Sequence, residues 1–118
     1  MTKIEIYGIA SCDTVRKARK ALDAAGTAYE FHDYKKAGIE VDRILGWAET
    51  QGMDRLLNRR GTTWRKLDDD AKRAAEDDKA AAALMADNPS LIKRPVVEHG
   101  DVVLVGFDET EWQAAGLL

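Results

Sequence analysis

Residues 3–34 carry a pattern of strand, helix and strand, and this pattern constrains the fold more than any other part of the sequence. Polar and apolar residues alternate over 3–7, which is typical of a β-strand. Residues 13–25 place apolar side chains at helical spacing before Gly26, a common helix stop. Alternation returns over 28–34 and predicts a second strand. Because a helix connects the two strands, they should be parallel neighbours in a βαβ unit.

The end of the chain predicts a β-hairpin followed by a helix. Two apolar runs within 94–108 flank His-Gly-Asp at 99–101, which is a hairpin signal. Residues 109–115 predict a last helix, and Asp108 is suited to cap its N-terminus. Combined with the βαβ unit, these segments predict an α/β fold with a four-stranded mixed sheet.

The middle of the chain contains no predicted strand and is expected to be helical. Helical spacing covers 41–51, and a short helix is expected around 53–58. Thr62 or Thr63 could cap another short turn. Two acidic helix starts within 69–87 predict two helices that break near Asp77, and Pro89 should end this region.

Length and composition fit one globular domain. The chain has 118 residues, of which 45% are hydrophobic and 33% charged. We expect a single domain over 1–118, with a core formed by 1–36 and 90–118. The stretch 37–89 would be a helical insertion between these two core segments.

Charge, hydropathy and cysteine content exclude several classes of protein. A net charge of −3 argues against a nucleic-acid binder that works through bulk charge. No apolar run approaches the roughly 20 residues that a membrane span needs, and the first residues lack the apolar centre of a signal peptide. One cysteine cannot form an internal disulfide. We therefore expect a cytoplasmic protein without a nucleic-acid or membrane partner.

The single cysteine, Cys12, lies where the first strand gives way to the basic helix, and Ser11 or Cys12 is placed to start that helix. Unpaired N–H groups and the helix dipole favour a thiolate there, by about 0.3–1 kcal/mol and at most about 2 kcal/mol. Arg16, one turn further on, can add positive charge, while the adjacent Asp13 opposes it. The thiolate is the reactive form of cysteine. The alternative is that Cys12 is a small buried residue, as free cysteines often are.

Arg94 and Pro95 come directly before the first strand of the hairpin. Proline lacks an N–H donor and therefore belongs at a strand start or edge, and an X–Pro bond there can be cis. If this strand lies beside the first strand, Arg94 and Pro95 come close to Cys12. The guanidinium would then favour the thiolate and bind an anionic substrate. The alternative is that Arg94 is simply solvated, as most arginines are.

Other candidate sites are weaker. His32 and His99 are far apart and lack metal-ligand spacing, so we expect no metal, and the glycines form no phosphate-binding fingerprint. The basic patch at 59–66 surrounds Trp64. It could bind glutathione carboxylates or a partner protein, or simply cap the active-site side of the fold.

Several segments together resemble the arsenate-reductase (ArsC/Spx) family over nearly the whole chain, and most closely its YffB-like branch. They are "YGIASCDTVRKARKAL", "FHDYKKAGI", "LLNRRGTTWRKL", "AAALMADNPSLIKRPVV" and "LVGF". The resemblance implies a thioredoxin-like (glutaredoxin-like) fold with a helical insertion.

The resemblance also implies roles for individual residues. Cys12 would be the redox nucleophile, Pro95 the cis-proline and Arg94 the anion-binding arginine. True arsenate reductases use two further arginines. The first falls at Asn58, beside Arg59 and Arg60, and the second falls at Phe107, which carries no charge.

The expected function is that of a single-cysteine thiol oxidoreductase that reduces a disulfide or oxyanion substrate through a covalent adduct at Cys12. The backbone amides of Asp13, Thr14 and Val15, with Arg94, would hold the anionic end of the substrate. The resemblance implies glutathione as co-substrate, with glutaredoxin as an optional partner and no bound cofactor.

Two alternatives stay open. One is arsenate reduction, with Arg59 or Arg60 supplying the missing charge. The other is a non-catalytic Spx-like regulator that binds RNA polymerase. Such regulators often carry a Cys-x-x-Cys switch, which cannot form here because Val15 stands at the fourth position.

Overall fold

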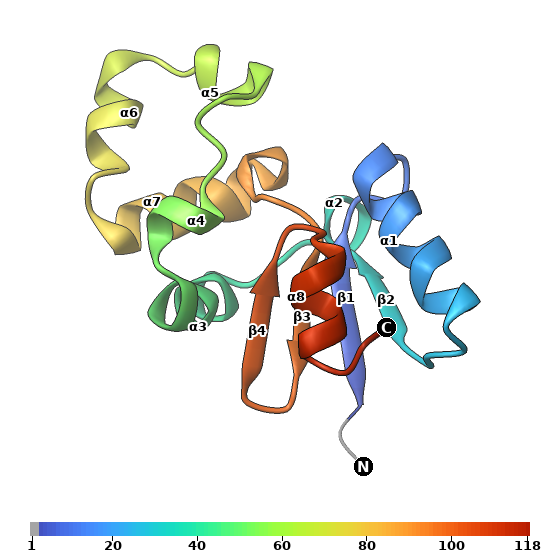
Figure 1. The fold of residues 1–118 in the computed structure, drawn as a ribbon. Coiled ribbons are helices and arrows are strands. Elements are labelled where there is room, and N and C mark those ends of the chain that lie inside the picture. Colours follow the sequence, from blue (N-terminus) through green and yellow to red (C-terminus); the bar gives the residue numbers. More distant parts are fainter. Residues whose placement is uncertain (1–2) are drawn as a thin grey trace. The chain divides into compact units, whose positions relative to one another are not determined.

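The computed structural model describes residues 3–118 (Figure 1). The chain divides into two compact units. The first combines the described part of Met1–Tyr34 with Arg94–Leu118, and the second is Lys35–Lys93. Within the described part of the chain, no helix has the length and apolar character that crossing a membrane requires.

The first unit contains a four-stranded sheet with the strand order β2-β1-β3-β4. Its strands are β1 (Ile4–Gly8), β2 (Glu30–Asp33), β3 (Val96–His99) and β4 (Val102–Val105). β2 runs parallel to β1, while β3 is antiparallel to both β1 and β4. The helix α1 (Asp13–Ala24) joins β1 to β2, and α8 (Glu109–Ala114) follows β4. This βαβ and ββα arrangement confirms the mixed sheet and the thioredoxin-like fold that the resemblance implies.

The core of this unit lies between one face of the sheet and the helices α1 and α8, as Figure 1 shows. Trp112 of α8 is fully buried, and its indole N–H donates to the Gly106 carbonyl with 3.2 Å between nitrogen and oxygen. Its ring meets the Phe107 ring edge-on, with 4.9 Å between the ring centres. Fully burying one large apolar side chain contributes about 1.5–3 kcal/mol. The other buried members of the cluster are Ile4, Ile6, Ala18, Leu22, Val97, Leu104 and Leu117.

The second unit is helical. The boundary between the two units falls within α2 (Tyr34–Ala37), directly after Tyr34. Within the second unit, α3 packs against α7. The elements are α3 (Val41–Gln51), α4 (Met53–Leu56), α5 (Thr62–Arg65), α6 (Asp69–Ala74), α7 (Asp78–Asp87) and the 3₁₀ turn η1 (Pro89–Leu91). One β-bridge, between Leu57 and Ile92, joins segments where no strand was expected.

Aspartate caps fix several helix starts where the sequence predicts them. Asp108 Oδ1 accepts from the Glu111 N–H at 2.9 Å and caps α8. Asp77 Oδ2 accepts from the Ala80 N–H at 3.0 Å, which confirms the break between α6 and α7. Such a cap contributes about 1 kcal/mol because it satisfies an orphan N–H donor.

Two local predictions were wrong. The second strand ends at Asp33, because its partner β1 ends at Gly8 opposite it, and Tyr34 instead begins α2. Neither Thr62 nor Thr63 caps α5, whose N-cap is Gly61. The prediction that Pro89 ends the helices within 69–87 is confirmed, because α7 ends at Asp87 and Pro89 then begins the 3₁₀ turn η1.

Candidate active site around Cys12

Cys12 is the N-cap residue of α1, as the sequence predicts. Its backbone is extended, its N–H donates to the Ile9 carbonyl at 3.0 Å, and its own carbonyl accepts from the Arg16 N–H at 3.0 Å. The thiol is free and partly exposed. This position excludes the alternative in which Cys12 is only a buried filler of the core.

Close packing holds the first turn of α1 against β1. Val15 is fully buried, and a Cβ added at Gly8 would lie 2.9 Å from Val15 Cγ2. Real Cβ atoms essentially never come so close to another heavy atom, so only glycine at position 8 allows this approach. The amide of Ala10 in the connecting loop donates to Asp33 Oδ2 at 3.1 Å. The loop that carries Cys12 is thereby fixed to both parallel strands.

Three hydrogen-bond donors around the sulfur favour its ionised form. Partial burial raises the pKa of the Cys12 thiol, but the backbone N–H of Val15 lowers it. The Arg94 side chain and the backbone N–H of Thr14 lower it further. The net result is a Cys12 pKa below the ordinary cysteine value, which increases the thiolate fraction near neutral pH.

Strand pairing explains how Arg94 reaches the thiol. β3 lies beside β1 with Val96 opposite Tyr7, so the residues just before Val96 arrive at the end of β1 from which the Cys12 loop leaves. The Arg94–Pro95 peptide bond is cis, and the Pro95 carbonyl accepts from the Gly106 N–H at 2.8 Å. The conditional prediction that Arg94 comes close to Cys12 is confirmed. Proximity of Pro95 to the thiol stays a prediction.

Tyr34 also belongs to this site, although the sequence predicts it only as the last residue of the second strand. Only 1% of Tyr34 is exposed. Burial raises the pKa of its phenol, and the charge and hydrogen bond of Arg94 only partly oppose this. The phenol therefore stays neutral and hydrogen-bonds the same guanidinium that favours the Cys12 thiolate. The sequence carried no signal for this role, because it depends on where β2 stops.

The structure places Asp13 and Arg16 differently from the expectation. The Arg16 guanidinium faces the Asp13 carboxylate at 3.4 Å, and both side chains are largely exposed. The groups that lower the Cys12 pKa are Val15, Thr14 and Arg94. Of the three backbone amides expected to hold an anion, those of Val15 and Thr14 lower the pKa of the Cys12 thiol.

Arg59 and Arg60 lie in the second unit, within the basic patch. Arg59 Nη1 donates to Asp54 Oδ1 at 2.9 Å, and its guanidinium lies 5.6 Å from the centre of the Trp64 ring. The Arg60 N–H donates to Asn58 Oδ1 at 3.0 Å. A role for either arginine at the thiol stays a prediction.

Comparisons with known proteins agree on one family. The model of the ArsC family matches residues 7–115. An uncharacterised protein of Haemophilus influenzae is 45% identical over 95% of this chain and 97% of its own length. The global transcriptional regulator Spx of Streptococcus mutans is 28% identical over 88% of this chain and 76% of its own length.

Solved structures show the same relationship. The structure named "YFFB (PA3664) protein" is 47% identical, with a TM-score of 0.91 over 96% of this chain and 98% of that one. An arsenate reductase (ArsC) related protein from Brucella melitensis is 42% identical, with a TM-score of 0.74 over 98% of this chain and 96% of that one. The chain belongs to the ArsC family.

Proposed function

We propose that this protein is a glutathione-dependent thiol oxidoreductase whose nucleophile is the Cys12 thiolate. One observation carries the proposal: a partly exposed thiol has its pKa lowered by two helix amides and a guanidinium. A cysteine with a purely structural role needs neither the exposure nor the donors, whereas thiol–disulfide exchange needs both. Similarity to an arsenate reductase related protein supports the same type of chemistry.

The substrate class that fits best is a mixed disulfide of glutathione with another thiol. The Cys12 thiolate attacks the glutathione sulfur, the original S–S bond breaks, and the substrate leaves as a thiolate that takes a proton from water. A free glutathione thiolate then attacks the glutathione sulfur of the Cys12–glutathione disulfide, and that S–S bond breaks. This releases oxidised glutathione and restores the Cys12 thiolate, so one mixed disulfide and one reduced glutathione give one free thiol and one oxidised glutathione.

The rest of the cycle must come from outside the chain, because its single cysteine has no resolving partner. Free glutathione, or the thiol of a glutaredoxin, would supply that partner. The cycle needs a compartment rich in reduced glutathione, which fits the cytoplasmic location expected for a single-cysteine chain.

Arsenate is a less suitable substrate. The position that aligns with the last arginine of arsenate reductases is Phe107, whose ring packs edge-on against the buried Trp112. This position therefore supports the core and offers no charge to an oxyanion. A hydrogen bond to a charged group contributes about 1.5–3 kcal/mol, so its loss weakens an arsenate site considerably.

The test is turnover of a glutathione mixed disulfide of a small thiol, measured with reduced glutathione and a coupled assay for oxidised glutathione. We expect wild type to be active and Cys12→Ser to be inactive, with the same circular dichroism spectrum and melting temperature within a few degrees. Arsenate assayed in parallel should be reduced much more slowly. Full activity in Cys12→Ser would refute the proposal. If arsenate were reduced faster than the mixed disulfide, arsenate and not the mixed disulfide would be the substrate.

A further inference from the structure

The sheet face opposite α1 and α8 carries a row of carboxylates across three strands. In the observed register, Glu5 of β1 lies directly opposite both Glu30 of β2 and Glu98 of β3. Like charges placed directly opposite each other destabilise a sheet unless cations neutralise them. The Lys3 ammonium forms an ion pair with Glu30 here. The row therefore concentrates negative charge at a place where a cation would bind favourably.

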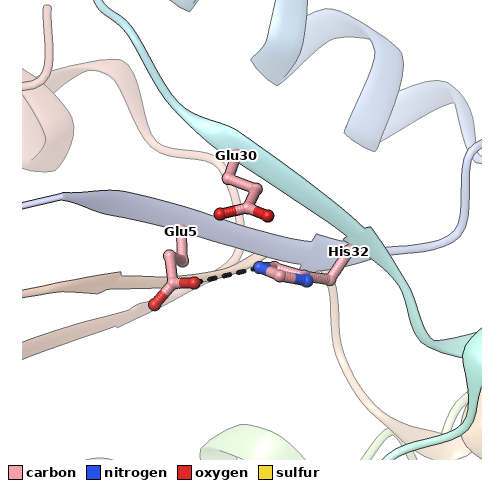
Figure 2. Close-up of side chains that lie close together, drawn as sticks. All are labelled: Glu5, Glu30 and His32. Atoms are coloured by element: carbon pink, nitrogen blue, oxygen red, sulfur yellow. Dashed lines mark hydrogen bonds and ion pairs between the residues drawn. The ribbon is translucent and has the colours of Figure 1, made fainter.

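One imidazole lies beside two of these carboxylates and bonds to that of Glu5 (Figure 2). The Nε2 atom of His32 lies 3.1 Å from Glu5 Oε1, and one ligand atom from each of Glu5, Glu30 and His32 lies within 4.8 Å of the other two. The His32 ring stacks on Tyr7, with 4.6 Å between ring centres and 16° between planes. This stacking fixes the ring so that Nε2 faces the carboxylates.

We propose that Glu5, Glu30 and His32 form a binding site for Zn²⁺. Hard cations such as Mg²⁺ and Ca²⁺ prefer oxygen ligands alone, whereas an imidazole with carboxylates suits zinc. Three protein ligands leave a fourth position open for water, as in zinc sites with three protein ligands generally.

The ligands are free to close on an ion. Metal–ligand bonds to zinc are about 2.0–2.2 Å long, so the three atoms must move closer to one another than they are. The side chains of Glu5 and His32 are 31% and 34% exposed, and that of Glu30 is 46% exposed. The glutamates can therefore rotate, while the stacked imidazole provides the fixed point.

This site is separate from the thiol. Glu5 and His32 lie along the paired length of β1 and β2, whereas the loop with Cys12 begins after β1 ends at Gly8. Zinc bound at the cluster would link the two parallel strands and stabilise the folded state by mass action. The inference therefore does not depend on the proposed redox function.

The test is calorimetric titration of the untagged full chain with Zn²⁺ in the Cys12→Ser background, which removes the competing thiol. We expect one zinc ion per chain and a higher melting temperature with zinc. His32→Gln and Glu5→Gln should each weaken binding at least about 10-fold to 100-fold, the range seen when even an outer partner of a metal ligand is lost. Lys3→Met should strengthen binding, because its ammonium competes with the ion for Glu30.

His99→Gln is the matched control. The chain has two histidines, and His99 pairs with Ile4, so it lies on the other face of the same sheet. Its replacement should leave zinc affinity unchanged. If His32→Gln does not fold, ¹⁵N spectra of the Cys12→Ser chain decide the question, because zinc should shift the His32 ring nitrogens and not those of His99. Absence of binding, equal affinity in a folded His32→Gln variant, or equal shifts at both histidines would overturn the proposal.

Discussion

Two polar clusters lie on or near β1, and they treat negative charge in opposite ways. Around Cys12, the donors of Val15, Thr14 and Arg94 surround one potential anion and lower its pKa. Around Glu5, carboxylates face one another across the sheet, with Lys3 and His32 as the neighbouring cationic or polarisable groups. The first cluster stabilises the charge of the resting thiolate, which is lost when an adduct forms. The second brings carboxylates together and, in our proposal, attracts a cation.

The difference also lies in what holds each cluster together. A helix N-terminus and the residue two before β3 surround the thiol, so two backbone amides and one side chain control it. Strand register positions the glutamates, so backbone pairing controls them. Substitutions around the thiol should therefore have graded effects, of which that at Arg94 should be the largest.

Replacing Arg94 should damage the thiol cluster most. Arg94→Met removes a charged hydrogen bond of the kind that contributes about 1.5–3 kcal/mol, so the thiolate should be roughly 10-fold to 100-fold less populated below its pKa. Alkylation of Cys12 by iodoacetamide as a function of pH measures this directly. Arg94→Lys, which keeps the charge, should lie between wild type and Arg94→Met. If all three proteins gave the same alkylation profile, Arg94 would have no effect on the pKa of the Cys12 thiol.

Filling the space at Gly8 should disturb the scaffold of the same cluster. In Gly8→Ala, the new Cβ meets Val15 at 2.9 Å, and overpacking of this kind costs about 1–3 kcal/mol of unfolding free energy. Urea denaturation measures the loss. Gly46→Ala is the control, because an added Cβ there meets nothing within 4 Å in the helix α3. That variant should be unchanged or up to about 1 kcal/mol more stable, and an equal loss in both variants would contradict the packing argument.

Removing the Tyr34 hydroxyl should have a smaller effect. Tyr34→Phe keeps the buried ring but deletes a hydrogen bond to Arg94, worth about 0.5–1.5 kcal/mol. The less firmly held guanidinium should raise the Cys12 pKa slightly and slow alkylation a few-fold, with no change in the circular dichroism spectrum. A rate identical to wild type would mean that Arg94 is positioned without Tyr34.

The pH dependence of stability should show the smallest effect. Because the Cys12 pKa is lower in the folded state, the unfolded chain binds more protons between the two pKa values, and unfolding free energy rises with pH there. Wild type should gain stability over Cys12→Ser as pH rises through the lowered pKa. The gain should be complete above the ordinary thiol pKa of about 8.5 and lost at acidic pH. Parallel denaturation curves at several pH values test this, and the opposite slope would refute the lowered pKa.

Local signals in the sequence were enough to predict the elements that local forces build. Asp108 and Asp77 start helices where their side chains accept backbone N–H groups, and Cys12 lies at a strand-to-helix junction that three or four neighbouring residues define. The position of Arg94 could be predicted only conditionally, because it depends on which strand lies beside β1.

Features that depend on register or on where a strand ends could not be predicted. Tyr34 reaches Arg94 because β2 loses its partner after Asp33. Glu5, Glu30 and His32 lie close together because β1 pairs with β2 in a register that places Glu5 opposite Glu30. Their spacing along the sequence contains no metal-ligand motif, so only the paired backbone shows the cluster.

The shared guanidinium of Arg94 has a consequence for the order of events in the proposed cycle. While Cys12 is a thiolate, its negative charge and the positive charge of Arg94 offset each other beside the neutral Tyr34. Once the sulfur is bound in an adduct, that negative charge is gone and no longer offsets the positive charge of Arg94. The Cys12–glutathione disulfide would then attract the incoming glutathione thiolate through the positive charge of Arg94. The loss of negative charge in the first half-reaction would in this way assist the second, which restores the Cys12 thiolate.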